Sequence, residues 1–553
     1  NDYIKRADVK VLYKYRITDA QLANGYIKNI TLESSDGTKL GKSIAAKVFI
    51  DCTYEGDLMA KAGVSYMIGR EDNKQYGETY NGVQLMKGHQ FPDGVDPYKI
   101  KGDSTSGLLW GISPAALSSD GTGDELIQAY NYRICLTDNP ANKIEITRPE
   151  NYDSTKYELL LRLFDAQPNK RKLNHYFIWS RMPNNKTDIN NRGGFSTDMI
   201  GMNHNYPEAS YEERAEIIKA HKDYTQGLLY FYKTDPRVPQ ELRDEIQAWG
   251  YPKDEYTEDN HWSPQLYIRE SRRMTGDYVM TQAHCEGRET VTDGIGMAAY
   301  TMDSHNCQRL LVKKDGKYMV KNEGNVEIGG GLPYPISYRS IIPKEEECKN
   351  LLVPVCLSAS HIAYGSIRME PVFMVLAQSA AIAAAEAINT GSVQTVDIKK
   401  VQALLHENPL LDGSFSEILI DDSELDLSIN NDWEVIKKQG GYGPTFLKSK
   451  VRNGSPVRFS PHMEHEGKYK VYTYYHMRKD ISPAITYSIS DGIDSWTRVI
   501  HKDSVRIEGQ TTGEWIELGT YNFQKSPMPY IEISTGDTSG AVIADAVLFI
   551  PVK

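Results

Sequence analysis

The stretch VFIDCTYEGDLMAKAGVSYMIGRE, residues 48–71, decides the fold. Its first part is an apolar run that ends at Asp51, which is typical of a buried strand, and TYEGDLMAKAG then predicts a turn and a helix. The residues up to Asp51 predict a series of closely spaced strands, at 9–13, 26–33 and 44–51. A β-meander that leads through a buried strand into a helix indicates an α/β arrangement.

A second informative stretch, residues 350–391, predicts a strand, a small polar loop and a long helix. The strand is expected at Leu351–Val355 and the helix at 371–389, with Pro371 in its first turn and Gly391 as its stop. The N-terminus of a helix carries free N–H groups and partial positive charge, so it can stabilise an anion. An ordinary strand–loop–helix packing unit explains the same pattern, and both interpretations stay open.

The segments on either side of this stretch have different characters. Ser210 and Glu213 form a capping box that predicts a helix to about His221, and Pro239 can open the next helix. The polar, glycine-containing segment 184–206 predicts an irregular loop. A short amphipathic helix is expected at 397–406.

Beyond about residue 425, strands separated by Gly, Asp and Ser turns predict an antiparallel β-sandwich. The strands are expected at 467–477, 485–489, 515–523, 530–534 and 541–551.

Composition excludes some classes of function. The 553 residues carry a net charge of -11, which argues against a nucleic-acid partner because phosphate binding needs clustered Lys and Arg. No apolar run reaches the roughly 18–20 residues of a membrane span. The 6 Cys are scattered without metal-type spacing, which favours buried free thiols over a disulfide framework, and no metal site is expected.

Three groups of side chains are candidates for chemistry, each with a structural alternative. The carboxylates between Asp51 and Asp57 suit either catalysis or turn capping. The Arg residues within 269–273 suit either anion binding or a structural ion-pair network. Four separate histidines suit either proton transfer or structural roles: His204, His261, His305 and His361.

At these same residues the sequence resembles the FAD-dependent oxidoreductase family, within the glutathione-reductase-like flavoprotein superfamily. The resemblance covers roughly residues 1–420 and rests on long motifs. These are VFIDCTYEGDLMAKAGVSYMIGRE at 48–71, YGETYNGVQ at 76–84, KTDINN at 186–191, HWSPQLYIRESRRMTGDYVMT at 261–281, PYPISYRSIIPKEEECKNLLVP at 333–354 and SASHIAYGSIRMEPVFMVLAQSAAIAA at 358–384.

The resemblance implies a Rossmann-like α/β fold that holds FAD, followed by a substrate region. The family's GxGxxG-bearing first βαβ unit, which cradles the FAD pyrophosphate, would precede Asn1, so FAD binding by this chain without it is expected to be weak. The resemblance implies FAD contacts from Asp51, Thr53, Ser360, Gly365, Arg368 and Gln378. It implies proton transfer by His361 or His204 with Arg269 nearby, and substrate contacts from Arg272, Arg273 and Asn203.

The C-terminal strands resemble the golvesin or xanthan-lyase-associated β-domain, on GKYKVYTYYHMR, WIELGTYNF and VIADAVLFI. That resemblance implies an extracytoplasmic, polysaccharide-associated protein whose Trp496, Trp515 and Tyr side chains can stack on sugars, although a cytoplasmic location stays open. Two functions follow as hypotheses. One is hydride transfer from a small organic or carbohydrate-like substrate to FAD. The other is non-catalytic carbohydrate binding on a flavoprotein scaffold, and a polysaccharide lyase is disfavoured.

The predicted domain order combines both resemblances, and the oligomeric state stays open. Residues 1–70 are the remainder of the FAD-binding domain, 71–335 the substrate region and 336–395 the C-terminal part of the FAD-binding domain. Residues 396–428 are a helical connector and 429–553 the golvesin-like β-sandwich.

Overall fold

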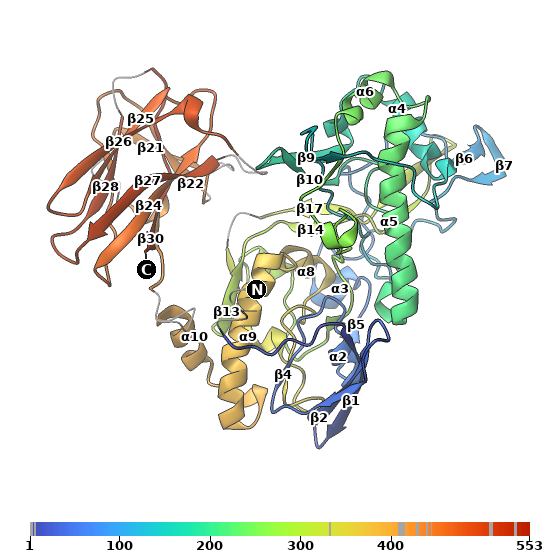
Figure 1. Ribbon diagram of the computed structural model, residues 1–553. Helices are drawn as coiled ribbons and strands as arrows, with labels where there is room; N and C mark the ends of the chain where they lie inside the picture. Colours follow the sequence, from blue (N-terminus) through green and yellow to red (C-terminus); the bar gives the residue numbers. More distant parts are fainter. Residues whose placement is uncertain are drawn as a thin grey trace. The chain divides into compact units, whose positions relative to one another are not determined.

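The structure, a computed structural model, describes residues 4, 7–330, 333–407, 415–426, 431–437, 441–443, 445–507, 513–535 and 539–552. The chain forms two compact units (Figure 1). Unit 1 comprises residues 1–179 and 189–402, and unit 2 comprises residues 180–188 and 403–553. The five-part domain order stays a prediction.

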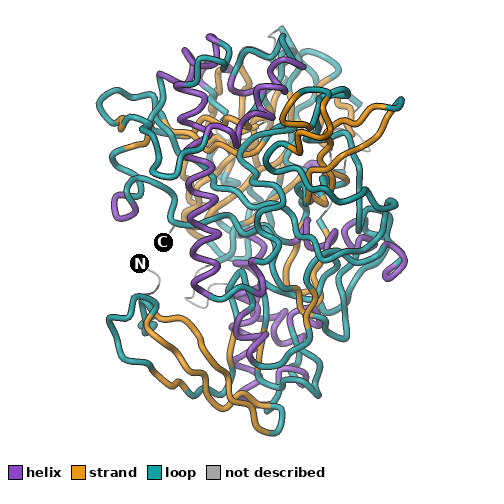
Figure 2. The backbone as a smooth tube through the Cα atoms, turned by 90° about the vertical axis from the view of Figure 1, so that its right-hand side faces the viewer, coloured by secondary structure: helices purple, strands orange, loops and turns teal. Residues whose placement is uncertain are grey.

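The N-terminal meander consists of β1 (Tyr15–Ala23), β2 (Tyr26–Ser34) and β3 (Lys42–Ile44), paired antiparallel in that order. Figure 2 shows β1 and β2 as a projecting ribbon at the lower left. The strand predicted at 9–13 is wrong, because those residues lie outside any strand and Val9 and Tyr13 are 57% and 64% exposed. Their alternation meets no partner strand, and pairing begins only at Tyr15.

The predicted α/β arrangement is present in a small form. Strand β4 (Phe49–Ile50) pairs in parallel with β19 (Leu351–Leu352), and β4 leads through a tight turn into α2 (Asp57–Lys61). Both strands are shorter than the sequence predicts. The Rossmann-like sheet and its upstream βαβ unit stay predictions.

Two helices follow β19, where the sequence predicts one. The stretch expected to be a loop contains α8 (His361–Ile367), because Ser360 caps it and its side chains are all buried. Helix α9 (Glu370–Thr390) starts one residue before the predicted helix and ends at Gly391, which has a φ of 91°. This positive φ explains the glycine stop.

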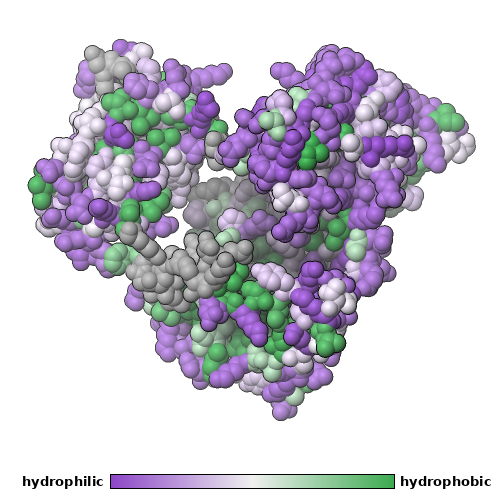
Figure 3. Space-filling model, in the orientation of Figure 1, coloured by the Kyte–Doolittle hydropathy of each residue, from purple (hydrophilic) through white to green (hydrophobic). Residues whose placement is uncertain are grey.

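Helix α9 also bears on the expectation that no segment spans a membrane. By length and composition it is apolar enough to cross one, with a mean hydropathy of 1.6. Its buried face packs like a core helix, with Phe373 and Leu376 inside and the Ser379 hydroxyl donating to the Ile295 carbonyl oxygen at 2.6 Å. Its outer face exposes Met374, and Figure 3 shows apolar side chains gathered in the lower part of the view, over this region.

The rest of unit 1 packs around a large aromatic core. Helix α5 (Tyr211–Thr234), the long helix in Figure 2, runs well past His221 because its buried face continues through Leu228 and Phe231. Pro239 caps α6 (Gln240–Gln247) instead of lying in its first turn. The segment predicted to be irregular contains β10 (Lys186–Asn191), which pairs with β9 (Phe177–Met182) to form a hairpin. Residues 180–188 of this hairpin are grouped with unit 2.

Many of the chain's tyrosine side chains are buried in this core. The fully buried tyrosines of unit 1 include Tyr130, Tyr132, Tyr157, Tyr176, Tyr224 and Tyr232. The other helices and strands of unit 1, with the helix that follows, are α3 (Asn73–Tyr76), α4 (Glu158–Ala166), α7 (Gln282–Cys285), α10 (Ile398–Glu407), β5 (Tyr66–Met67), β6 (Tyr98–Ile100), β7 (Asp103–Leu108), β8 (Lys143–Ile144), β11 (Tyr251–Pro252), β12 (Arg273–Met274), β13 (Gly294–Ala298), β14 (Met302–Ser304), β15 (Gln308–Lys314), β16 (Lys317–Glu323), β17 (Val326–Ile328) and β18 (Tyr334–Ser337).

Unit 2 confirms the predicted antiparallel β-sandwich. Its sheets have the orders β20-β30-β24-β27, β21-β22-β29 and β23-β28-β25-β26, and they share one apolar core that includes Val471, Ile489 and Phe549. The strands are β20 (Ile418–Asp421), β21 (Trp433–Lys437), β22 (Thr445–Ser449), β23 (Val457–Phe459), β24 (Gly467–His476), β25 (Ala484–Ser490), β26 (Ser495–His501), β27 (Gly513–Phe523), β28 (Tyr530–Ser534), β29 (Ile543–Ala544) and β30 (Ala546–Pro551).

The cysteines are free thiols, as the sequence predicts. Burial is less general than expected: Cys307, Cys348 and Cys356 are buried, whereas Cys52 is exposed.

Candidate functional site

Acidic side chains from distant segments occupy the N-terminus of α8. The Ser360 hydroxyl caps the helix by accepting from the Ala363 N–H, and it donates to Oε1 of Glu78 at 2.6 Å. The His361 N–H donates to Oε2 of Glu71 at 2.9 Å. Carboxylates are stabilised at a helix N-terminus, so Glu71 and Glu78 occupy the position where an external anion would bind.

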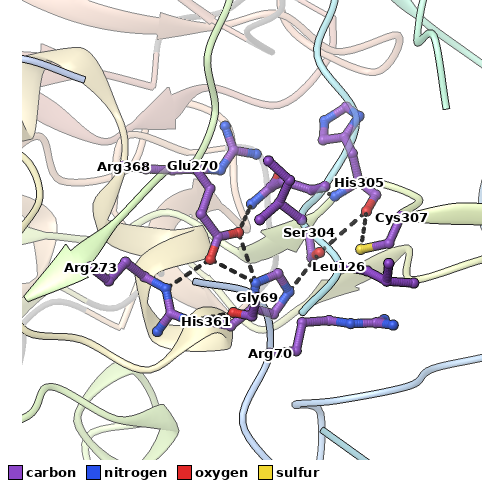
Figure 4. A network of polar contacts seen from close by, with 12 residues as sticks. Gly69, Arg70, Leu126, Glu270, Arg273, Ser304, His305, Cys307, His361 and Arg368 are labelled. Atoms are coloured by element: carbon purple, nitrogen blue, oxygen red, sulfur yellow. Dashed lines mark hydrogen bonds and ion pairs between the residues drawn. The ribbon is translucent and has the colours of Figure 1, made fainter. Parts of the chain in front are cut away.

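The imidazole of His361 is bonded at both ring nitrogens (Figure 4). Its Nδ1 atom lies 2.8 Å from Oε2 of Glu270, and its Nε2 atom lies 3.0 Å from Oγ of Ser304. The Ser304 hydroxyl in turn lies 3.3 Å from the carbonyl oxygen of His305. The proton on the ring therefore decides the direction of the Ser304 hydrogen bond.

Charge compensation around Glu270 is dense. Arg273 donates to Oε1 of Glu270 at 2.8 Å and to Oε1 of Glu71 at 2.6 Å, and all these groups are buried. Burial by itself raises the pKa of the Glu270 carboxyl, but His361 and Arg273 outweigh it and hold that pKa at about 2. Glu270 is therefore a fixed anion that orients His361.

The order Ser304–His361–Glu270 has the connectivity of a nucleophile–base–acid triad, but its surroundings do not suit nucleophilic attack. Ser304 and Glu270 are 0% and 1% exposed, and Ser304 lies between the His361 ring and the His305 carbonyl. This arrangement can hold or relay a proton, and it aligns β14 with α8.

A second carboxylate–histidine pair lies next to the first. The Nδ1 atom of His305 lies 2.7 Å from Oδ2 of Asp198, and Arg269 donates to Oδ1 of Asp198 at 3.0 Å. Burial raises the pKa of Asp198, but Arg269 and His305 bring it down to about 2. Burial, with the charge of Arg269, lowers the pKa of His305 despite Asp198.

This second pair leaves one ring nitrogen available. A neutral His305 that donates its Nδ1 hydrogen to Asp198 has Nε2 as an acceptor, and Nε2 lies 3.8 Å from Oδ2 of Asp303. The His305 side chain is 11% exposed, compared with 2% for His361. Of these two predicted histidines, His305 therefore has the more accessible acceptor.

Two buried guanidinium groups lie beside this pair. Arg269 and Arg368 lie 5.1 and 5.9 Å from the ring centroid of Tyr267, and Arg368 donates to the Asp303 carbonyl oxygen at 3.1 Å. The Nε atoms of both arginines are buried and have no hydrogen-bond partner among the described residues. Buried donors of this kind carry a free-energy cost that a bound acceptor would remove.

Asp51 and Thr53, which the resemblance implies as FAD contacts, have local roles in the structure. Oδ1 of Asp51 accepts from the Thr53 hydroxyl at 2.7 Å, and Oδ2 accepts from the Met59 N–H at 3.0 Å. The Thr53 hydroxyl then accepts from the Gly56 N–H at 3.0 Å. These bonds hold the β4–α2 turn, in agreement with the turn-capping alternative.

The predicted Arg cluster divides between two sites. Arg272 donates to Asp57 at 2.9 Å and to Glu208 at 2.8 Å, away from the network around Glu270. Arg269 and Arg273 lie in the buried pairs described above. The ion-pair alternative therefore accounts for much of this motif.

Three other implied FAD or substrate residues lie in packing positions. Gly365 lies where α8 crosses β14, and a Cβ atom there would come within 2.8 Å of the Asp303 carbonyl oxygen. Gln378 lies on α9, half-buried. Asn203 is fully buried and donates to the Gln128 carbonyl oxygen at 2.9 Å. Next to it, His204 accepts from the Ile127 N–H at 3.3 Å, and burial lowers its pKa.

Sequence reasoning named His305 but missed its partner Asp198, and it missed Glu270 and Glu71 as partners of His361. No local spacing connects them, since the partners lie on separate segments. Only the sequence positions of two partners hinted at their roles. Asp198 lies in the polar segment GGFSTDMIG, and Glu270 lies among the predicted arginines.

The structure divides into a unit of mixed helices and strands and an all-β unit, and one family model matches each of them. The family described as FAD dependent oxidoreductase matches residues 1–405, and the Golvesin C-terminal domain matches residues 418–551. The chain belongs to the FAD-dependent oxidoreductase family and carries a C-terminal golvesin domain. Both resemblances identified in the sequence are confirmed.

Individual relatives add little. No curated protein matches significantly. A Paenibacillus xanthan lyase structure is 22% identical over 25% of this chain and 13% of its own, with a TM-score of 0.22. A family 35 carbohydrate binding module from Clostridium thermocellum is 8% identical over 24% of this chain and 97% of its own, with a TM-score of 0.19. A Podospora anserina GH26-CBM35 mannanase is 10% identical over 25% and 28%, with a TM-score of 0.20. Likenesses with TM-scores this low carry no functional information about the chain.

Proposed function

We propose that unit 1 oxidises a small organic or carbohydrate-like alcohol, with His305 as the group that accepts the hydroxyl proton. The observation that carries this is the Asp198–His305 pair beside two arginines with unsatisfied donors. Bound FAD would supply the hydride acceptor. The protein would supply the base, the positive charge and the exclusion of water.

Each side chain has a distinct part in this proposal. Asp198 holds the Nδ1 hydrogen of His305, so Nε2 is the acceptor, and its negative charge stabilises the imidazolium that forms. Arg269 keeps Asp198 ionised. Arg368 and Arg269 would direct their free Nε donors toward the flavin, where negative charge develops on reduction.

The residues fit the flavin ring better than they fit the rest of the cofactor. The two free Nε donors suit acceptors such as ring nitrogen or carbonyl oxygen. By contrast, Asp51 and Thr53 already use their oxygens within the β4–α2 turn, so contact with the nucleotide half of FAD would compete with those bonds. Weak FAD binding by this chain therefore stays our prediction.

The remaining implied residues are assigned supporting parts. His361 would be a positioning residue, because both of its ring nitrogens are bonded within the protein. Arg273 would keep Glu270 and Glu71 ionised beside it. His204 stays a hypothesis for proton transfer, and Asn203 and Arg272 stay hypotheses for substrate contact.

The test uses the full chain titrated with FAD, followed by flavin absorbance and by quenching of FAD fluorescence. Saturable binding, weakened by Arg368→Gln but not by Arg288→Gln on the surface, would support the proposal. The loaded protein is then mixed anaerobically with sugars and polyols, and bleaching of the flavin identifies a substrate. If FAD shows no saturable binding, or Arg368→Gln binds as tightly as the unchanged protein, the assignment fails.

The second candidate function is glycan binding by unit 2. Tyr442, Tyr474 and Trp515 form a partly exposed aromatic cluster, with ring centroids 5.3 to 5.9 Å apart. Aromatic faces of this kind stack on sugar rings, and an extracytoplasmic location would bring the domain to polysaccharide. The test is a binding screen of the full chain against soluble polysaccharides, with Trp515→Ala and Trp496→Ala as the variants.

A further inference from the structure

Three carboxylates of unit 2 converge where two paired strands end. Asp421 is the last residue of β20, Asp422 follows it, and Asp545 lies between β29 and β30. Because β20 and β30 pair with Asp421 opposite Ala546, these three acidic residues come together although they are far apart in sequence. One oxygen from each lies within 4.8 Å of the others.

The cluster contains buried oxygens without partners. Asp545 is 0% exposed and Asp422 is 2% exposed. Oδ1 of Asp545 and Oδ2 of Asp421 have no hydrogen-bond partner among the described residues. A buried carboxylate oxygen that accepts no hydrogen bond carries a free-energy cost in the folded protein. These atoms therefore point to a bound cation.

The existing contacts of the cluster compensate it only in part. Oδ2 of Asp545 accepts from the Tyr442 N–H at 3.0 Å, and Asp422 accepts from the Thr445 hydroxyl at 3.0 Å. Burial, followed by the charge of Asp421, raises the pKa of Asp422 to about 6. Burial, together with the charges of Asp422 and Asp421, raises the pKa of Asp545 to about 7.

Two glycines bring the chain close to the carboxylates. A Cβ atom at Gly441 would lie 2.8 Å from Oδ2 of Asp545, and one at Gly443 would lie 2.8 Å from Oδ2 of Asp421. The Thr445 carbonyl oxygen is also near, at 3.0 Å from the Cβ position of Gly441. A side chain at either position would therefore crowd the carboxylate oxygens, so the two glycines let the backbone pass close to the cluster.

We propose that Asp421, Asp422 and Asp545 bind a calcium ion that ties the 441–443 segment to the β20–β30 strand pair. The three residues offer oxygen ligands only, and a hard cation with flexible coordination suits carboxylates completed by carbonyl oxygens and water. Zinc and copper favour the nitrogen and sulfur ligands that this cluster does not contribute. Magnesium is disfavoured because it requires near-ideal octahedral geometry.

The site has a structural consequence for the neighbouring surface. Tyr442, whose N–H bonds to Asp545, places its ring 5.3 Å from Trp515 and 5.9 Å from Tyr474. A calcium ion that fixes the 441–443 segment would therefore also fix the exposed aromatic cluster.

The test titrates CaCl₂ into the EGTA-treated full chain by isothermal calorimetry, with TbCl₃ luminescence excited through the nearby Tyr442 and Trp515 as a second readout. We expect one equivalent of Ca²⁺ and a rise in the melting temperature of unit 2. Asp545→Asn and Asp421→Asn should each weaken binding about tenfold or more. Asp494→Asn is the matched control, because that side chain is exposed on the same unit.

A folding defect can be separated from loss of the ion. Each Asp→Asn change removes repulsion among the carboxylates, so in EGTA the variants should melt at or above the temperature of the unchanged protein. Loss of Ca²⁺ binding with such a melt confirms the site. The proposal is overturned if the unchanged protein binds no Ca²⁺ at a Ca²⁺ concentration 10-fold above about 1 mM. It is also overturned if Asp545→Asn binds Ca²⁺ as tightly as the unchanged protein.

Discussion

The Nδ1 atom of His305 lies 2.7 Å from Oδ2 of Asp198, and the other oxygen of that carboxylate accepts from Arg269 at 3.0 Å. Asp198 is fully buried, so its charge depends on these two neighbours. The pair thus fixes the imidazole tautomer and leaves Nε2 as the acceptor. Under the proposed function, this is the pair that would receive a proton from a substrate hydroxyl.

Asp198→Asn should therefore slow proton transfer without weakening cofactor binding. An amide cannot stabilise the imidazolium, so the rate of flavin reduction should fall by about 10² to 10⁴, while FAD affinity changes little. Because the negative charge is lost, the pKa of His305 should fall further, and the alkaline plateau of the rate profile should begin at lower pH. Stopped-flow reduction at several pH values measures both effects. Asp120→Asn, on the surface, is the control. An unchanged rate would remove His305 from its proposed role.

Glu270→Gln tests the buried network by stability. Glutamine keeps the shape of the side chain, but Arg273 and His361 lose their shared anion inside the protein. Removing one partner of a buried pair costs about 3–5 kcal/mol, whereas an exposed change such as Glu346→Gln should stay within about 0.5 kcal/mol. Urea unfolding followed by tryptophan fluorescence gives both values. A loss below about 1 kcal/mol would mean that Glu270 is protonated in the folded state.

Helix caps and turns could be predicted from the sequence, whereas strand pairing could not. Asp51, the Ser210–Glu213 capping box and Gly391 were predicted from local patterns, because caps and turns depend on neighbours within a few residues. The strand at 9–13 failed because alternation alone does not supply a pairing partner.

Single side chains of the site could be named from the sequence, but their contacts could not. The residues alone singled out His305, His361 and the arginines within 269–273, and the family resemblance implied roles for His361 and Arg269. Their partners Glu270 and Asp198 lie on other segments, so spacing could not connect them. The same limit applies to Asp545, which meets Asp421 only through strand pairing. Contacts of this kind depend on the tertiary fold and leave no periodic pattern in the chain.

His221 should make unit 1 sensitive to mild acid. Its Nδ1 atom bonds to the Ile217 carbonyl oxygen at 2.8 Å, and its buried Nε2 has no partner among the described residues. Burial lowers the pKa of His221 to about 4, whereas the unfolded chain has an ordinary value of about 6.5. The unfolded state therefore binds the proton first, and stability falls as the pH drops from about 6.5 to about 4.

His221→Gln should reduce that pH dependence. The difference in pKa corresponds to about 3 kcal/mol, so the free energy of unfolding of the variant should vary less between pH 7 and pH 4.5. Urea unfolding at several pH values measures the slope. His462→Gln removes an exposed histidine and should leave the slope unchanged. Equal slopes for His221→Gln and the unchanged protein would show that His221 is protonated without penalty.

Trp515→Ala should distinguish glycan binding from core packing in unit 2. Trp515 lies opposite Tyr474 on paired strands β24 and β27 and contacts Tyr442, so its removal breaks the aromatic cluster. Loss of one stacking face costs about 0.5–1.5 kcal/mol, which weakens binding of a recognised polysaccharide by about 2- to 10-fold. Trp496→Ala is the matched control, because Trp496 is 38% exposed and pairs with Tyr521 at 4.9 Å, outside this cluster. Affinity electrophoresis against the polysaccharide found in the screen gives both values, and melting temperatures show that each variant is folded. If Trp496→Ala loses binding and Trp515→Ala does not, the sugar-binding face lies around Trp496; if neither variant changes affinity, both tryptophans serve the fold alone.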